Sequence, residues 1–180
     1  MVSTKRLTTI AVLVALAIVL HLFEALIPIP FPIPGVKLGL ANIVTLLALV
    51  LFDSKTAFLI VILRTVLGSL LSGTLLNIAF FLSFSGAIAA TCLMALLLQL
   101  APAASFKFRF SLLGISVAGA AAHNLGQLAM AALLIKHTGI FYYLPIMLLS
   151  SVPTGFLTGL LLRELLNYLQ SSGQLDDFLI

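Results

Sequence analysis

The sequence has few charged residues, one cysteine and no tryptophan. Only 8% of its 180 residues are charged, whereas 62% are hydrophobic, and the mean hydropathy is +1.29. A soluble domain of this length cannot cover so much apolar surface, but a lipid bilayer can accommodate it. Cys92, the single cysteine, excludes an intrachain disulfide and a cysteine-rich metal site. The composition therefore predicts an integral membrane protein.

Common catalytic and nucleotide-binding motifs are also missing. The sequence contains no G-x-x-x-x-G-K-[ST] loop, no H-E-x-x-H and no G-x-S-x-G. Its few carboxylates are too scattered to hold Mg²⁺ against a diphosphate, so we expect neither an enzyme nor a bound cofactor or metal. The nine basic residues form no run or patch, which argues against a nucleic-acid partner.

The apolar residues form long runs that end at proline, glycine or charged residues. Alternating strand patterns are absent, so the prediction is an all-α membrane protein, a six-helix bundle forming one domain over residues 1–180. The expected helices cover residues 6–27, 37–52, 55–72, 76–100, 110–136 and 141–169, and a polar tail follows at 171–180. The second helix is too short to cross a ~30 Å hydrocarbon core, so we expect it to lie among its neighbours.

The distribution of basic residues predicts the orientation of these helices. The first apolar run carries His21 and Glu24 and ends in prolines, which favours a retained helix over a cleaved signal peptide. With the N-terminus inside, the inner side would hold Lys5, Arg6, Lys55, Lys107, Arg109 and Arg163, and the outer side Lys37 and Lys136. The positive-inside rule then places both termini in the cytoplasm of a multi-pass cell-membrane protein.

Residues 28–36 carry alternating prolines at positions 28, 30, 32 and 34. Proline fixes φ and lacks a backbone donor, so this segment cannot continue either helix. In a polyproline conformation of ~3.1 Å per residue it would span roughly 28 Å, about the mouth of a small helix bundle. On the outer side, such a stiff segment is expected to cover a ligand pocket.

Polar residues inside the predicted helices concentrate toward this outer side. Arg64 lies near the predicted midplane, where a charge is costly and normally faces the bundle interior or a wet cavity. We therefore predict a small-molecule site that favours a polar or anionic ligand. Its candidate residues are Glu24, Lys37, Asn42, Arg64, Asn77, His123, Asn124 and Gln127.

Each of these residues also has a structural interpretation. Arg64 and Glu24 could form a buried ion pair, and His123 and Asn124 could hydrogen bond between helices. Asn77 could cap a helix, and Lys37 could reach the headgroups. Their shared preference for one leaflet favours the pocket over independent structural uses.

Small residues four apart mark a second candidate surface. Leu7, Ala11 and Ala15 form an L-x-x-x-A-x-x-x-A pattern in the inner half of the first helix. Such spacing lets another helix approach closely. The stripe predicts a docking face for a membrane partner, although packing within the bundle would use the same spacing.

Three segments carry a resemblance to a known family. They are residues 34–42 (PGVKLGLAN), 64–74 (RTVLGSLLSGT) and 123–127 (HNLGQ). They resemble the Gx transporter family, which is also labelled heptaprenyl diphosphate synthase component I. With the first-helix alanine pattern, the chain resembles the substrate-binding (S) components of energy-coupling-factor transporters over about residues 5–168.

This resemblance implies a ligand site near the outer side, between the first outer loop and helices 4 to 6. It also implies a transmembrane coupling protein docked on Ala11 and Ala15, with cytoplasmic ATPases that drive transport. The expected function is therefore substrate capture for an importer. Two alternatives are a non-catalytic accessory subunit of isoprenoid or quinone synthesis, and a stand-alone carrier. The substrate itself is not implied.

Overall fold

The computed structural model describes residues 4–26, 39–100 and 109–173, and every regular element in these ranges is helical. The elements are α1 (Thr4–Leu26), α2 (Leu40–Leu51), α3 (Ser54–Leu71), α4 (Ile78–Leu100), α5 (Arg109–Ile135), the 3-10 helix η1 (Thr138–Tyr143) and α6 (Leu144–Ser171). Five helices, counting η1 and α6 as one span, are long and apolar enough to cross a membrane. The prediction of a helical membrane bundle is confirmed.

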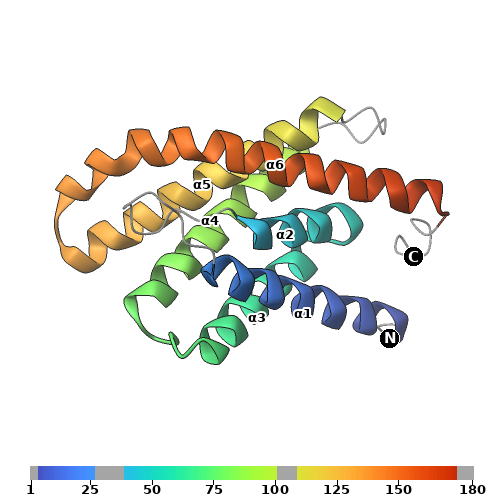
Figure 1. Cartoon of the computed structure of the whole chain (residues 1–180), viewed down its shortest axis with the longest axis horizontal. Coiled ribbons are helices and arrows are strands. Elements are labelled where there is room, and N and C mark those ends of the chain that lie inside the picture. The colour runs from blue at the N-terminus through green and yellow to red at the C-terminus, as the bar shows by residue number, and fades with distance from the viewer. Residues whose placement is uncertain (1–3, 27–38, 101–108, 174–180) are drawn as a thin grey trace.

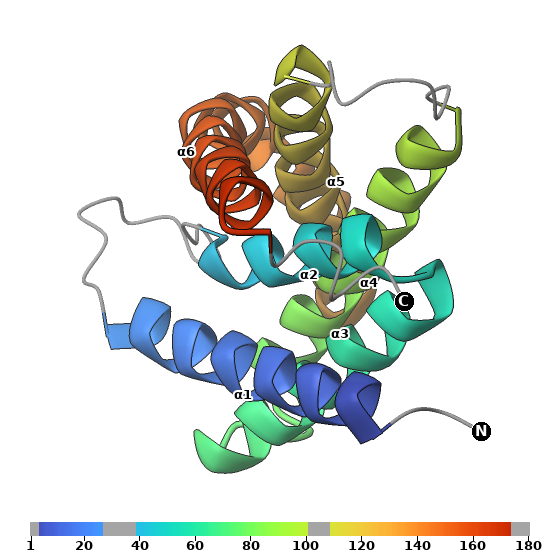
Figure 2. The ribbon, with the colours of Figure 1, turned by 90° about the vertical axis from the view of Figure 1, so that its right-hand side faces the viewer.

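The short helix α2 occupies the centre of the bundle. It lies between the α1–α3 pair and the α5–α6 pair, with α4 packed beside it (Figure 2). Its 12 residues rise about 18 Å. Eight of them are buried, including Val44, Leu46 and Ala48. As predicted, α2 lies among its neighbours, and its apolar side chains form much of the core.

Local backbone geometry accounts for the differences between predicted and observed helix bounds. α2 begins at Leu40 rather than at 37 because Gly39 adopts a left-handed conformation with φ of 75°. α4 begins after Leu76, which also has a positive φ, of 64°. The predicted helix 141–169 is a 3-10 helix up to Tyr143, and the α-helix continues to Ser171.

The two ends of the bundle are set by the up-and-down order of the helices. The start of α1 and the end of α6 lie on the same side of the molecule (Figure 1). This end also holds the junction between α2 and α3, where Asp53 caps α3 by accepting a 2.7 Å hydrogen bond from the Thr56 amide. The opposite end holds the end of α1, the start of α2 and the α3–α4 turn.

Large apolar side chains cover the outside of the bundle. Val19 is 61% exposed, Leu133 71% and Leu149 71%, and they belong to three different helices. Exposed apolar surface of this extent around a bundle is typical of contact with lipid. The chain is therefore a multi-pass membrane protein.

Candidate functional site

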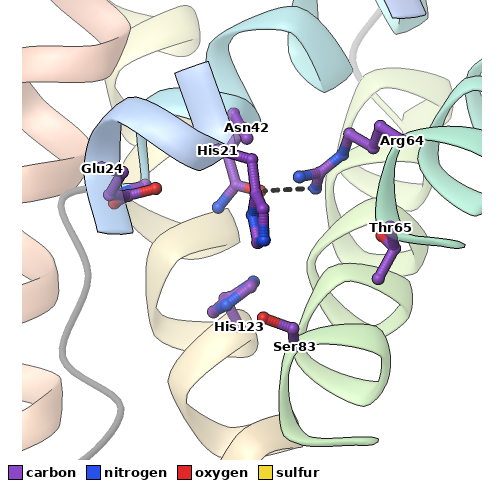
Figure 3. A pocket seen from close by; sticks show the side chains of 9 residues that line it. His21, Glu24, Asn42, Arg64, Thr65, Ser83 and His123 are labelled. Atoms are coloured by element: carbon purple, nitrogen blue, oxygen red, sulfur yellow. Dashed lines mark hydrogen bonds between the residues drawn. The ribbon is translucent and has the colours of Figure 1, made fainter. Parts of the chain in front are cut away.

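Five helices meet around a polar cavity in the half of the bundle where α1 ends and α2 begins (Figure 3). Its volume of about 20 Å³ is enough for about one water molecule. The lining residues are His21, Glu24, Gly39, Ala41, Asn42, Arg64, Thr65, Ser83 and His123. They come from α1, the start of α2, α3, α4 and α5. The resemblance implied a site between the first outer loop and helices 4 to 6; of these helices, α4 and α5 contribute described residues to the lining.

Arg64 brings a positive charge to the cavity from the second half of α3. The residue is only 4% exposed. Its Nη2 donates to the Oδ1 of Asn42 at 3.3 Å, and within the described ranges its buried Nε has no hydrogen-bond partner. A guanidinium has five N–H donors. Arg64 is thus buried with less hydrogen bonding than its charge requires, and an acceptor in the cavity would correct this.

Glu24 brings a negative charge from the last turns of α1. It is 5% exposed, and its carboxylate accepts a hydrogen bond from the backbone N–H of Gly39. Gly39 precedes α2 and has no side chain with which to cap it. A carboxylate at this position satisfies one unpaired amide and interacts favourably with the helix dipole. Glu24 therefore both lines the cavity and caps α2.

The buried ion pair considered as an alternative for Arg64 and Glu24 is not formed. Arg64 bonds to Asn42, and no ion pair between Arg64 and Glu24 occurs in the described structure. Figure 3 places the two side chains on opposite sides of the cavity, with Asn42 and His21 between them. Opposite charges therefore lie on two sides of the cavity, without a direct ion pair between Arg64 and Glu24.

Two histidines enter the cavity where the facing helix carries a glycine. A Cβ on Gly68 of α3 would lie 3.2 Å from His21 Cδ2. A Cβ on Gly86 of α4 would lie 2.8 Å from the His123 carbonyl oxygen and 3.0 Å from its Cδ2. The contact at Gly86 leaves no room for a side chain, whereas at Gly68 the His21 ring would have to shift by a few tenths of an ångström. The glycines therefore provide the space that each imidazole occupies.

The three polar residues of α5 predicted as site residues have different positions. His123 lines the cavity, but Asn124 is turned toward α6, where its Nδ2 donates to the Met147 carbonyl at 2.6 Å. This is the interhelical hydrogen bond considered as its structural alternative. Gln127 is 3% exposed and packs against Gly86, and its Oε1 has no hydrogen-bond partner in the described part of the chain. It lies beside the cavity lining rather than in it.

The other predicted residues lie elsewhere. Asn77 is exposed in the α3–α4 turn, where its Oδ1 accepts a 2.6 Å hydrogen bond from the Ile78 amide, so it is placed as a helix-start residue. Lys37 and the proline-rich segment 28–36 lie outside the described residues, as does the tail from 174. Ala11 and Ala15 are both exposed, on a side of α1 that does not pack into the bundle.

Comparison with protein-family models identifies the family of the chain. The chain matches the family model described as heptaprenyl diphosphate synthase component I over residues 13–165. The chain belongs to this family. A search of curated proteins and a search of solved structures returned no significant match. The matched region contains all residues that line the cavity in this member of the component I family.

In this component I member, three side chains line the cavity that the sequence analysis did not include in the predicted site: His21, Thr65 and Ser83. His21 was recognised as an intramembrane polar residue but was not included in the site. Thr65 and Ser83 gave no signal, because a hydroxyl in an apolar helix usually bonds to its own backbone, as Thr65 does with the Val61 carbonyl at 2.8 Å. Thr65 could have been suspected only from its position next to Arg64.

Acidic residues are dispersed in the described part of the chain. No three His, Cys, Asp or Glu side chains gather there in a way that could hold a metal ion. Glu24 and Asp53 lie at opposite ends of the bundle, at the end of α1 and before α3. The cavity lining instead presents charged, amide, imidazole and hydroxyl side chains.

Proposed function

We propose that this protein is the substrate-binding membrane subunit of a multi-component importer, and that it captures a small polar or anionic compound without catalysing a reaction. The observation that carries the proposal is Arg64, a buried cation on the cavity wall whose Nε has no hydrogen-bond partner among the described residues. Placing a charge at membrane depth costs about 2.5–3.5 kcal/mol on insertion scales. A bound acceptor group would offset that cost.

The distribution of basic residues supports an outward-facing cavity. Lys5, Arg6, Lys55 and Arg163 lie toward the end of the bundle where α1 begins, and Lys136 lies at the cavity end, after α5. The positive-inside rule assigns the more basic end to the cytoplasm. The cavity would then lie in the outer half of the membrane, where an imported compound is captured.

The exposed side of α1 that carries Leu7, Ala11 and Ala15 supports docking of a coupling protein. Leu7 is 56% exposed, and Ala11 and Ala15 are exposed along the same helix face. Residues with short side chains at this spacing allow a second helix to approach α1 closely. This face would receive a transmembrane coupling protein that acts with cytoplasmic ATPases.

A second candidate function comes from the family's name. The protein could be a membrane accessory of heptaprenyl diphosphate synthesis that works with a separate catalytic subunit. The dispersed acidic residues of the described chain favour a non-catalytic role in this case also, since diphosphate chemistry needs several carboxylates around Mg²⁺.

The role of Arg64 can be tested by native mass spectrometry of protein purified from its natural membrane. We expect wild type and Arg163→Gln to carry the same small molecule. Arg64→Gln should lose it by roughly 10- to 100-fold, as expected for one or two charge-assisted hydrogen bonds. Arg163 is a matched control, because it lies on α6 away from the cavity. Retention of the ligand by Arg64→Gln, with only a lower unfolding temperature, would assign Arg64 a structural role.

The identity of the partner separates the two candidate functions. Under the importer proposal, wild type and Ala129→Trp should co-purify with a membrane coupling protein and ATPases, whereas Ala11→Trp should lose them. Ala129 is also exposed, but it lies on α5. Co-purification of a prenyl diphosphate synthase instead would favour the accessory function. Equal partner recovery from both tryptophan variants would exclude the α1 face as the docking surface.

A further inference from the structure

We propose that Gln127 is a ligand-binding residue, and that the captured compound carries a hydrogen-bond donor for its amide in addition to the acceptor that binds at Arg64. This inference rests on the proposed function and narrows the substrate class of the same site. It follows from a comparison of two buried amides on α5, Asn124 and Gln127, which differ in their hydrogen bonding.

Asn124 is an amide whose hydrogen bond the fold itself provides. The residue is 8% exposed, and its Nδ2 donates to the carbonyl oxygen of Met147 on α6 at 2.6 Å. Such a bond joins two helices at membrane depth, where no water is at hand to replace it. Asn124 therefore has a structural role.

Gln127, three residues further along α5, has no such bond from its oxygen. The residue is 3% exposed, and its Oε1 is buried without a hydrogen-bond partner in the ranges that the structure describes. An unpartnered amide in apolar surroundings destabilises a fold, because its hydration is lost and not replaced. A methionine would fill nearly the same space without that cost. The amide is therefore better explained by binding than by packing.

The side chain of Gln127 lies next to a residue of the cavity wall. It follows His123 by four positions, so both belong to one face of α5. A Cβ on Gly86 of α4 would lie 2.8 Å from Gln127 Cγ and 3.0 Å from His123 Cδ2, so both side chains pass α4 at this glycine. The imidazole of His123 lines the cavity, on the side of Ser83 (Figure 3). A compound that extends past this imidazole along α5 would reach the Gln127 amide.

The size of the cavity requires such an extension. A volume of about 20 Å³ holds roughly one water, so any larger molecule must displace neighbouring side chains. Movement of Gln127 breaks no hydrogen bond of its Oε1 to a described residue, whereas movement of Asn124 would break its bond to Met147. Extension of the cavity toward Gln127 is therefore the less costly of the two.

The two unpartnered atoms specify the chemistry of the compound. The Nε of Arg64 is a donor, so it binds an acceptor, for which a carboxylate oxygen is well suited. The Oε1 of Gln127 is an acceptor, so it binds an N–H or O–H group. We therefore expect a compact molecule that carries both functions, and hydroxycarboxylates are the simplest anions of this kind.

The first test replaces each amide with an apolar residue of similar size. Gln127→Met and Asn124→Leu would be purified in detergent, and native mass spectrometry would confirm that no small molecule is bound. We expect Gln127→Met to raise the thermal unfolding midpoint by roughly 2–4 °C, since it removes an unpartnered buried amide. Asn124→Leu should lower the midpoint, because it leaves the Met147 carbonyl without its donor. An unchanged or lower midpoint for Gln127→Met would show that its amide is already satisfied in the fold, and would overturn the proposal.

The second test uses acids that differ by one hydroxyl group. Acetate and propionate supply only the acceptor, whereas glycolate and 3-hydroxypropionate are the same acids with an added O–H donor. The shift of the unfolding midpoint, at equal concentration and ionic strength, reports binding by circular dichroism. We expect at least one hydroxylated acid to give wild type a larger shift than its parent acid. Gln127→Met should reduce that shift to the parent level, Asn124→Leu should preserve the difference, and Arg64→Gln should abolish both shifts.

Two results of this second test would overturn the role of Gln127. These are equal shifts in wild type for each acid and its hydroxylated form, or a hydroxyl effect that persists in Gln127→Met. Either result rejects the donor requirement alone if Arg64→Gln still loses the molecule that co-isolates with wild type. If Arg64→Gln retains that molecule, the capture function fails as well.

Discussion

The two ends of the bundle use their charged residues in opposite ways. At the end where α1 begins, Arg6 donates to Asp53 at 2.6 Å and to Thr56 at 3.0 Å, and both charged side chains are partly exposed. At the cavity end, Arg64 is buried and makes a single 3.3 Å hydrogen bond to Asn42 within the described structure. In the described structure, the exposed Arg6 therefore bonds directly to a carboxylate, whereas the buried Arg64 bonds to an amide.

Under the proposed function, the cavity end binds the ligand and the other end stabilises the fold. An exposed ion pair stabilises a fold by about 0–1 kcal/mol and has a small desolvation cost. The Arg6–Asp53 pair therefore stabilises the contact between α1 and the start of α3 only modestly. A buried charge without a direct counterion costs several kcal/mol. Under the proposed function, Arg64 is retained in that position, with Glu24 on the opposite side of the cavity, because it binds the ligand.

The largest expected effect comes from breaking the helix contact behind the cavity. A Cβ on Gly86 would meet the His123 carbonyl at 2.8 Å, so Gly86→Ala must push α4 and α5 apart. Overpacking of this kind typically costs about 1–3 kcal/mol. We expect a loss of that size in the free energy of unfolding, measured in mixed micelles by circular dichroism. Because His123 lines the cavity, ligand binding should weaken as well.

Gly114→Ala is the matched control for this variant. Gly114 lies on the exposed side of α5, and an added Cβ there would meet nothing within 4 Å. Its unfolding free energy should stay the same or rise by up to about 1 kcal/mol, since alanine favours a helix. If both variants unfold alike, the α4–α5 contact does not hold the cavity wall in place.

The helices could be predicted from sequence because their limits have local causes. Prolines, glycines and charges interrupt the apolar runs, and the helix starts differ from prediction by at most three residues, as at α2 and α6. Even the burial of α2 follows from its length, which is too short to cross a bilayer. The left-handed conformation of Gly39, which delays the start of α2, could not be predicted from the local sequence.

The cavity could be predicted only in part, because it depends on how each helix is rotated. Glu24, Asn42, Arg64 and His123 were expected in a site and do line one cavity. Asn124 is next to His123 in sequence, yet a turn of about 100° per residue directs it to Met147 on α6. Sequence alone does not choose between those faces, since the contacts of the neighbouring helices decide the rotation.

The smallest expected effect concerns Asp53, at the end of the bundle where α1 begins. The N–H of Thr56 donates to this carboxylate and, together with Arg6, lowers the pKa of Asp53 below its usual 3.8. A lowered pKa means that the charged form stabilises the fold at neutral pH, and that this contribution is lost as the pH falls below about 4.

Two variants of Asp53 separate its charge from its capping oxygen. Asp53→Asn keeps a capping oxygen and should lower the free energy of unfolding by under about 1 kcal/mol, whereas Asp53→Ala also loses the cap and should lower it by about 1–2 kcal/mol. Unfolding followed at pH 7 and pH 3 checks this, with both costs expected to shrink at pH 3. A cost that stays constant between the two pH values would show that the Asp53 charge does not contribute, and the contrast between the two ends would then lie in hydrogen bonding alone.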